Sequence, residues 1–228
     1  MNKKILFSSC VAVLALAGCT NLDENLFSQV SMDNYGKTES EIQTIVGGAY
    51  ASLRGYSSAS AEGNGVNCYP TCEYVFFLNE CASDEACIPT RGTDWYDGGR
   101  YQELQHHTWT PANLCVLSAW RYAFTGVSKV NAIIYQVEQS NLSADAKKSV
   151  EAELRGLRAY YYYLLLDEFG NVPIVKDYTV SELPANSDRK DVYAFVESEL
   201  DDIMNELPDG VEYGRFTQNV AHLLQARL

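Results

Sequence analysis

The sequence has 228 residues, with 17 lysines and arginines against 30 aspartates and glutamates, and a formal net charge of −13. Because such an acidic surface repels nucleic acid and anionic lipid, neither is an expected partner. A neutral ligand would not be repelled. The 16 tyrosines each offer an apolar face and a hydroxyl, which suits a hydrated, sugar-like ligand, although helix packing is the alternative role for most of them.

The first nineteen residues have the pattern of an exported bacterial lipoprotein. Lys3 and Lys4 precede the 12-residue apolar stretch 5–16, which is shorter than the roughly 20 residues that a membrane-spanning helix needs. The stretch ends in Leu-Ala-Gly directly before Cys19, which resembles the lipobox at which bacteria acylate a cysteine and cleave before it. We therefore predict a signal peptide at 1–18 and a lipid anchor on Cys19, with an ordinary secretory signal as the alternative.

The mature part then begins with a polar stretch. Residues 19–37 are expected to form a leash that joins a folded domain at 38–228. Asp23 and Glu24 partly resemble a surface-export signal of Bacteroides-group bacteria. Without the two lysines of the signal, 15 basic residues remain against 30 acidic ones, a net charge of −15. No later run of 18 apolar residues occurs, so lipid alone is expected to hold the protein at a membrane.

Cys10 leaves with the signal peptide, and the mature part keeps five cysteines besides Cys19: Cys68, Cys72, Cys81, Cys87 and Cys115. An odd number cannot all pair within one chain, and the spacing matches no zinc-binding pattern. We expect most of them to be small buried apolar residues. A disulfide between the first two is an alternative that spacing does not settle.

Helix signals dominate the folded part. Thr38 and Glu41 form a capping box, and apolar residues then recur at helical spacing from Ile42 to Leu53, before Gly55 ends the helix. The segment 56–110 differs, because its glycines and prolines are mixed with many aromatic residues. We predict long excursions from the helical scaffold there, and the aromatic content argues against disorder.

Four further helices are expected, each with a capping signal before a run of apolar residues. Their predicted starts are Thr110-Pro111, Ser143, Ser187 and Thr217. Gly170 and Pro173 stop the second of these helices, and residues 208–210 (Pro-Asp-Gly) end the third. Their pairing suggests helix-turn-helix repeats. The sequence stops at Leu228 inside the apolar pattern of the last helix, which predicts the N-terminal portion of a longer protein.

Short stretches over nearly the whole mature part form a combination that is specific to one family. They are 47–53 (GGAYASL), 83–99 (SDEACIPTRGTDWYDGG), 120–122 (WRY), 130–133 (VNAI), 151–160 (EAELRGLRAY), 169–174 (FGNVPI), 214–217 (GRFT) and 220–224 (VAHLL). In this combination the sequence resembles the SusD/RagB-like nutrient-uptake lipoproteins of Bacteroidetes.

The resemblance implies a mainly α fold of tetratricopeptide-like helix pairs with long aromatic- and Gly-rich loops. It also implies an outer-membrane lipoprotein that faces the cell surface and binds an oligo- or polysaccharide. Its implied partner is a SusC-like TonB-dependent transporter. Neither enzymatic activity nor a cofactor is expected.

The family's hallmark stretch, 151–160, is expected to be scaffold. Gly156 permits a close approach to the helix. Arg155 and Arg158 can pair with acidic residues along the helix or on neighbouring helices. The stretch therefore identifies the family without carrying its binding chemistry.

The candidate sugar site is Arg91, Asp94, Trp95 and Tyr96. A sugar ring needs a flat aromatic face for its C–H side and planar polar groups for its hydroxyls. Trp95 would be the stacking platform with Tyr96 beside it, while Arg91 would donate and Asp94 would accept hydrogen bonds. In the alternative interpretation Trp95 packs on the scaffold, and Arg91 and Asp94 pair to shape the loop.

The other tryptophans and the histidine pair are assigned to structure. Trp109 is predicted to be a core anchor, and Trp120 lies on an apolar helix face. His106 and His107 are adjacent, so on a strand they would point to opposite faces, and no metal site is expected.

Two other functions stay open as alternatives. Four acidic residues, Asp84, Glu85, Asp94 and Asp97, are close in sequence, and a glycosidase needs two carboxylates at a set separation. No nucleophile-elbow, phosphate-binding-loop or zinc-protease motif is present. A helical protein-interaction lipoprotein without a glycan ligand is the remaining alternative.

Overall fold

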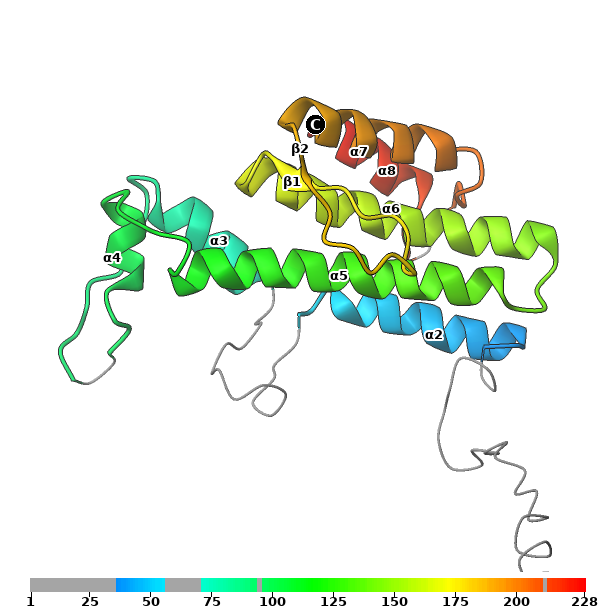
Figure 1. Cartoon of the computed structure of the whole chain (residues 1–228), viewed down its shortest axis with the longest axis horizontal. Helices are drawn as coiled ribbons and strands as arrows, with labels where there is room; N and C mark the ends of the chain where they lie inside the picture. Colours follow the sequence, from blue (N-terminus) through cyan, green and yellow to red (C-terminus); the bar gives the residue numbers. More distant parts are fainter. Residues whose placement is uncertain (1–35, 56–70, 94–95, 211–212) are drawn as a thin grey trace, which may run out of the picture. The chain divides into compact units, whose positions relative to one another are not determined.

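The computed structural model describes residues 36–55, 71–93, 96–210 and 213–228, without the side chains of 71–74. The predicted signal peptide, Cys19 and nearly all of the leash lie outside these residues. The described part forms helices and one pair of two-residue strands (Figure 1), in the order α2 (Glu39–Ser52), α3 (Thr71–Cys81), α4 (Arg100–Gln105), α5 (Leu114–Glu138), α6 (Ala144–Glu168), β1 (Val172–Pro173), β2 (Asn186–Ser187), α7 (Arg189–Ile203) and α8 (Gln218–Gln225).

Local capping sets where two of these helices begin, as the sequence predicted. The Glu41 N–H donates to Thr38 Oγ1 (3.3 Å), and the Thr38 N–H donates to the Glu41 carboxylate (3.0 Å), so the capping box of α2 is confirmed. Ser143 caps α6 by accepting from the Ala146 N–H (3.3 Å). Gly170, at φ 73°, takes the left-handed conformation that follows the end of α6.

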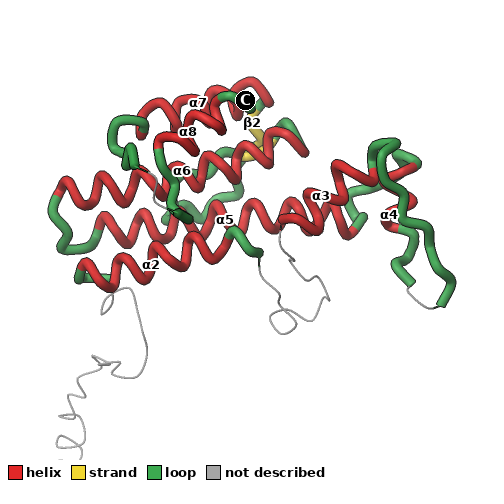
Figure 2. The backbone as a smooth tube through the Cα atoms, turned by 180° about the vertical axis from the view of Figure 1, so that it is seen from behind, coloured by secondary structure: helices red, strands yellow, loops and turns green. Residues whose placement is uncertain are grey.

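The longest helices, α5 and α6, form the centre of the fold. Each has 25 residues and is therefore about 37 Å long. A short connection joins them into an antiparallel pair, α2 packs against this pair, and α7 packs against α6 with α8 beside it (Figures 1 and 2). The prediction of a mainly α fold built from helix pairs is confirmed. No helix within the described ranges has both the length and the apolar character to cross a bilayer.

The connection between α6 and α7 lies along the central pair. β1 and β2 pair antiparallel, with Val172 opposite Ser187. Just beyond β1, the Val175 N–H donates to the Tyr162 hydroxyl (2.7 Å), and the Val175 carbonyl accepts from Asn131 Nδ2 (2.9 Å). Burial raises the pKa of the Tyr162 phenol to about 12, so this anchor stays neutral.

Two apolar clusters stabilise the fold. The larger joins α2, α5, α6, α7 and α8, and the smaller joins α3, α4 and the first turns of α5. Phe169 and Val75 pack against both clusters. Several tyrosines are core residues, as the packing alternative predicted; those exposed by 3% or less are Tyr101, Tyr122, Tyr161 and Tyr162.

The prediction of loops throughout 56–110 is wrong for two segments, because α3 and α4 are helices. In α3, Val75, Leu78 and Cys81 recur every third residue, and all three pack in the smaller cluster. Phe76 interrupts this apolar pattern on the exposed side, with 51% of its surface accessible. Because aromatic residues lie on both the packed and the exposed side of α3, the sequence shows no clear apolar face at helical spacing.

The predicted start of α5 at Thr110-Pro111 is also wrong, by three residues. Thr110 Oγ1 accepts from the Ala112 N–H (3.3 Å), and its carbonyl accepts from the Asn113 N–H (2.9 Å), so it stabilises a separate turn. Asn113 caps the helix by accepting from the Cys115 N–H (2.9 Å). Two capping residues in close succession made the boundary ambiguous in the sequence.

The described cysteines follow the expectation in part. Cys81 and Cys115 are buried in the smaller cluster, and burial raises the pKa of the Cys81 thiol. Cys87 is free and exposed. The suggested disulfide between Cys68 and Cys72 lies outside the described side chains.

Candidate functional site

The loop that carries the predicted sugar site is held by an end lobe, which we define as α3, α4 and the described residues between them. Phe77 of α3 and Tyr101 of α4 meet edge to face, with ring centroids 4.8 Å apart. Gln105 Nε2 donates to the Ser83 carbonyl (3.2 Å), and His107 Nε2 lies 2.7 Å from the Ala82 carbonyl oxygen. The chain that leaves α3 is therefore fixed against α4 before it enters the loop.

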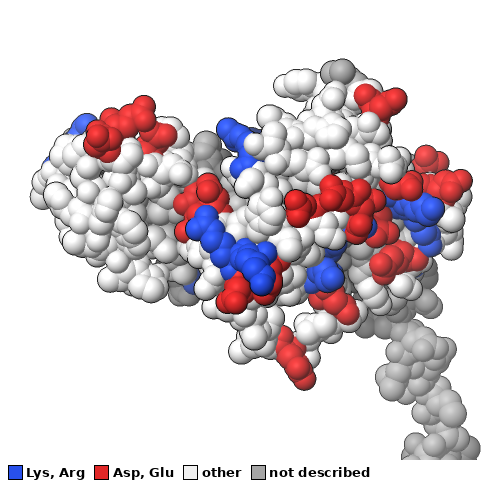
Figure 3. All heavy atoms as spheres, turned by 90° about the horizontal axis from the view of Figure 1, so that it is seen from above, with Lys and Arg blue, Asp and Glu red and all other residues white. Residues whose placement is uncertain are grey.

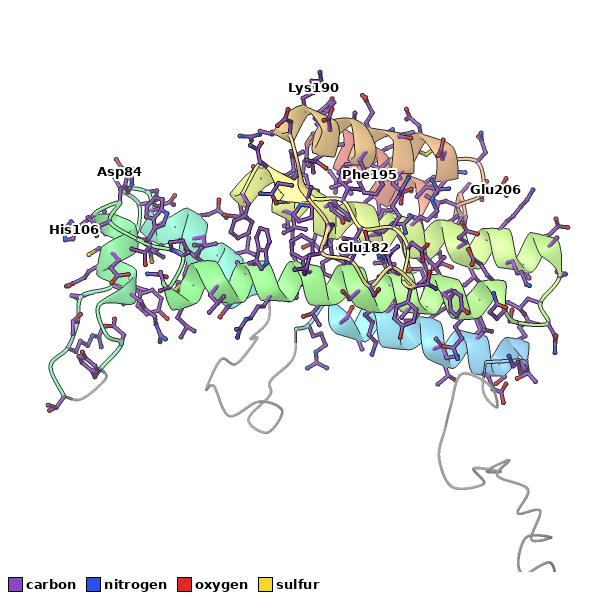
Figure 4. All side chains as sticks on the ribbon, viewed as in Figure 1. Asp84, His106, Glu182, Lys190, Phe195 and Glu206 are labelled. Carbon is purple, nitrogen blue, oxygen red and sulfur yellow. The ribbon has the colours of Figure 1, made fainter. Side chains whose placement is uncertain are left out.

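A hydrogen-bonded base closes the loop that carries the predicted sugar site. Asp97 is 8% exposed and accepts from Thr90 Oγ1 (3.2 Å) and from the Gly99 N–H (2.7 Å). Gly98 and Gly99 have φ of 70° and 82°, a conformation that favours glycine. Asp97 is thus engaged in shaping the loop, while Asp84 and Glu85 are exposed; Figure 4 shows Asp84 and His106 at the surface of the end lobe.

Two of the four predicted site residues lie within the described structure, and both are exposed. Arg91 precedes the tip of the loop, and Tyr96 follows it with 77% of its surface accessible. The bond between Thr90 and Asp97 brings the two arms that carry them together. Asp94 and Trp95 fall outside the described residues, so their predicted roles stay predictions.

An aromatic groove lies next to this lobe, and the sequence interpretation did not find it. It has a volume of about 500 Å³ and is lined by Trp109, Pro111, Val116, Leu117, Trp120 and Phe169. Trp120 contacts Phe169 edge to face at 5.1 Å between ring centroids. Aromatic rings along an open groove are the feature that binds apolar faces of ligands.

The prediction that Trp109 is a core anchor is wrong, because 43% of its surface is exposed. It precedes α5 by five residues, and its ring meets the His107 ring edge to face, with the centroids 5.3 Å apart. Trp120 is confirmed in part as a core residue. Together with Phe124 (4.6 Å between centroids) it packs against the larger cluster, and it lines the groove as well.

Glu168, the last residue of α6, lies at the joint between this helix and α3. Its carboxylate accepts from Asn79 Nδ2 (2.8 Å). Burial raises the pKa of the Glu168 carboxyl to about 7, and the hydrogen bond from Asn79 offsets part of that rise. The carboxyl therefore titrates closer to neutral pH than an ordinary glutamate does.

The two arginines of 151–160 bind to acidic residues of α7, as the scaffold interpretation predicted. Arg158 donates to Glu199 Oε2 through Nε (2.8 Å) and Nη2 (2.6 Å), and to Asn131 Oδ1 (2.9 Å). Arg155 donates to Glu199 Oε1 (2.8 Å) and to Asp202 (2.9 Å). One carboxylate of α7 thus receives two guanidinium groups of α6.

A second charged cluster fixes the segment that leads into α8. Arg215 donates to Glu153 through Nε (2.7 Å) and Nη2, and the Tyr50 hydroxyl donates to the same carboxylate (2.6 Å). The Phe216 N–H donates to that hydroxyl (2.7 Å). Burial raises the pKa of the Tyr50 phenol, and the hydrogen bond to Glu153 raises it further. This cluster joins α2, α6 and the residues before α8.

His106 and His107 contribute to packing and turn geometry. His106 ends α4, and His107 has φ of 55° where the chain turns toward Trp109. No group of three or more histidine, cysteine or acidic side chains with metal-site geometry occurs among the residues that the structure describes.

The helix pairs form a helical-repeat scaffold that carries an exposed loop and an aromatic groove. The SusD-like family described as "Starch-binding associating with outer membrane" matches residues 78–228. The chain belongs to this SusD-like family.

Relatives support the assignment over most of the chain. SusD-like protein P2 of Formosa agariphila is 26% identical over 212 residues, which are 91% of this chain and 39% of that protein. The starch-binding protein SusD of Bacteroides thetaiotaomicron is 27% identical over 158 residues, 68% of this chain and 27% of that protein. The chain therefore spans about two fifths or less of the length of these relatives.

Solved structures show the same fold. A laminarin-binding SusD-like protein superposes with a TM-score of 0.67 at 24% identity and covers 84% of this chain and 40% of its own. Surface glycan-binding protein A of Bacteroides thetaiotaomicron, in complex with laminarihexaose, superposes with a TM-score of 0.65 at 23% identity and covers 83% and 38%.

Proposed function

We propose that this protein is a surface glycan-binding lipoprotein that captures oligosaccharide for a SusC-like TonB-dependent transporter and does not cleave it. Membership of the SusD-like family, together with the exposed aromatic surface on and beside the end lobe, carries the proposal. The names of the relatives and neighbours, which include starch-binding and laminarin-binding proteins, support glycan as the ligand class.

The proposed site consists of Trp95 as the stacking platform, Tyr96 beside it, and Arg91 and Asp94 as hydrogen-bonding groups. Tyr96 and Arg91 are exposed on the two arms of one loop, which suits contact with a ligand from solvent. Trp109 adds an exposed indole in the aromatic groove. An indole covers a sugar face at a low cost in conformational entropy, because it has two rotatable bonds.

Replacing Trp95 with alanine is expected to weaken oligosaccharide binding about tenfold or more. Stacking of a base on an aromatic ring contributes about 1–3 kcal/mol, sugar stacking lies toward the low end, and about 1.4 kcal/mol corresponds to one decade of affinity. Titration calorimetry with maltohexaose and laminarihexaose measures the effect. Trp109→Ala tests the groove in the same assay, and Tyr213→Ala, which removes a fully exposed ring elsewhere, is the matched control.

Three results would contradict parts of the proposed function. Unchanged affinity in Trp95→Ala, with a stability loss of about 3–5 kcal/mol, would make that indole a scaffold residue. Release of reducing ends from polysaccharide by the purified protein would show glycosidase activity, whereas a pure binder is only retarded in an affinity gel. Transporter binding without affinity for any glycan would instead favour a protein-interaction lipoprotein.

Cys19→Ala is expected to abolish acylation and to remove the protein from the outer membrane. Radioactive palmitate labelling and membrane fractionation measure this. Palmitate labelling that persists in the variant would rule out Cys19 as the anchor.

The transporter partnership is tested separately, with an affinity tag on the unmodified protein. A TonB-dependent transporter is expected to co-purify with it. Purification without any such transporter from cells grown on the bound glycan would contradict the partnership.

A further inference from the structure

Two cysteines flank the turn that leads from α3 toward the predicted sugar loop. Cys81 is the last residue of α3, Cys87 follows six positions later, and both are free thiols. Cys81 is fully buried, whereas Cys87 is exposed. Since the described residues contain no group of three or more side chains with metal-site geometry, a metal does not account for the pair.

The chain reverses directly after α3 and returns to the apolar cluster that it left. The Ser83 N–H and the Ser83 hydroxyl both donate to the Glu80 carbonyl (3.3 and 2.8 Å). Ile88, the neighbour of Cys87 in sequence, then packs against the smaller cluster, of which Cys81 is a member. Because the turn and the packed Ile88 hold both ends of this segment, the two cysteines stay near each other.

The ionisation of the inner thiol agrees with this proximity. Burial raises the pKa of the Cys81 thiol, and the neighbouring Cys87 and Glu80 raise it further. Cys87 is therefore close enough to act on Cys81 electrostatically. A thiol reacts as its thiolate and only where a reagent can reach it, so the exposed Cys87 is the thiol that reacts first with an oxidant.

The predicted location of the protein is one in which paired thiols become oxidised. The signal peptide predicted at 1–18 directs the chain out of the cytoplasm. Disulfides form and persist in the bacterial periplasm, which thiol–disulfide oxidoreductases keep oxidising. An exposed thiol with a second thiol beside it can there close an internal bridge.

We propose that Cys81 and Cys87 form a disulfide that fastens the chain entering the sugar loop to the end of α3. The inference depends on the predicted export of the protein and is independent of glycan binding. The oxidant is the disulfide of a thiol–disulfide oxidoreductase. After deprotonation, the Cys87 thiolate attacks this disulfide, forms a mixed disulfide and releases one oxidoreductase thiolate. The Cys81 thiolate then attacks the Cys87 sulfur and displaces the second, so two electrons and two protons leave the pair and reduce the oxidoreductase to its dithiol.

The bridge closes a ring of seven residues, 81–87, at the edge of the end lobe. Such a ring restricts the unfolded chain and so stabilises the folded one, by a modest amount because the ring is short. The chain beyond the ring reaches Thr90, whose hydroxyl donates to Asp97 (3.2 Å) at the base of the loop. The bridge and this hydrogen bond together fix the arm that carries Arg91.

Peptide mapping by mass spectrometry tests the bridge in the full-length protein purified from the bacterial envelope. Free thiols are alkylated first, and a protease that cleaves after glutamate then cuts at Glu80, Glu85 and Glu103. Peptides 81–85 and 86–103 are expected to appear linked, at their combined mass less two hydrogens. Cys87→Ser should abolish the linked pair, and Cys68→Ser, the matched control, should keep it.

A second arm oxidises the reduced protein in solution and so tests the geometry without export. Exposed Asp84 and Glu85 lie within the turn, and Figure 3 shows acidic side chains gathered on the end lobe, at left. Because this surface repels anionic glutathione, the small cationic disulfide cystamine is the oxidant. It is expected to produce the same linked peptides, with Cys87 modified first.

Thermal melts give an independent readout of the bridge. Tris(2-carboxyethyl)phosphine is expected to lower the melting temperature of the unmodified protein by about 2–5 °C more than that of Cys87→Ser. The comparison removes the contribution of any other disulfide that the reductant opens. Equal shifts in the two proteins would contradict a stabilising bridge.

Three mapping outcomes would overturn the proposal. The first is alkylation of both cysteines in protein whose Cys19 carries lipid, because the lipid shows that the chain was exported. The second is a bridge from Cys81 or Cys87 to any other cysteine. The third is cystamine that stays attached to Cys87 while Cys81 remains a thiol, because the two sulfurs then do not meet. Alkylated thiols in protein without lipid on Cys19 contradict the predicted export instead, and the cystamine arm then decides.

Discussion

Glu199→Ala is expected to lower the free energy of unfolding by about 3–5 kcal/mol, the largest loss from any single change considered. The Arg158 and Glu199 side chains are each 6% exposed, and they are joined at 2.6 Å. Removing the carboxylate leaves the Arg158 guanidinium buried without its counter-charge, and its remaining contacts to Asn131 and a backbone carbonyl do not neutralise it. Urea denaturation with an unchanged slope measures the loss.

Two variants separate this effect from general damage to α7. Asp202→Ala removes a carboxylate that also pairs with Arg155 but is 59% exposed, so it is expected to change stability by less than about 1 kcal/mol. Arg158→Met combined with Glu199→Leu replaces the buried pair by apolar side chains and is expected to recover most of the loss. Equal losses in Asp202→Ala and Glu199→Ala would contradict the assignment of a buried pair.

The parts of the fold that were predictable depend on interactions between residues near each other in sequence. The capping box of α2 and the Ser143 cap of α6 each join residues three positions apart. The start of α5 failed because both Thr110 and Asn113 accept local backbone hydrogen bonds, and only the tertiary packing of the helix selects between them. β1 and β2 have two residues each, too few for a periodic pattern.

The exposure of the candidate loop could be predicted from the sequence, whereas the aromatic groove could not. The exposed loop with Arg91 and Tyr96 followed from its residue types, and both side chains are exposed. The groove forms where Phe169, at the end of α6, lies beside Trp109 and Trp120. These residues are far apart in sequence, so no local spacing predicts that they share a groove. Glu199 left a signal that was missed, because it occupies the apolar face of α7 between Val196 and Leu200.

In the hallmark stretch, the contact between Gly156 and Phe216 leaves no room for a side chain at position 156. The Phe216 ring is 4% exposed and lies directly on the Cα of Gly156, so that a Cβ there would overlap the ring atoms. The glycine therefore accommodates an aromatic side chain from the residues before α8, whereas the sequence had suggested close approach of a helix. The stretches 151–160 and 214–217 are thus two halves of one contact.

Gly156→Ala is accordingly expected to destabilise the protein by about 1–3 kcal/mol through overpacking, although alanine is the better helix former by about 1 kcal/mol. Gly47→Ala is the matched control in α2, where a Cβ meets nothing within 4 Å, and it is expected to stabilise by about 0.5–1 kcal/mol. Both are measured by urea denaturation. In a Phe216→Ala background the penalty at position 156 should disappear, since the alanine methyl then fills space that the ring has left. A penalty that persists without the ring would place its origin in the helix backbone and contradict the contact.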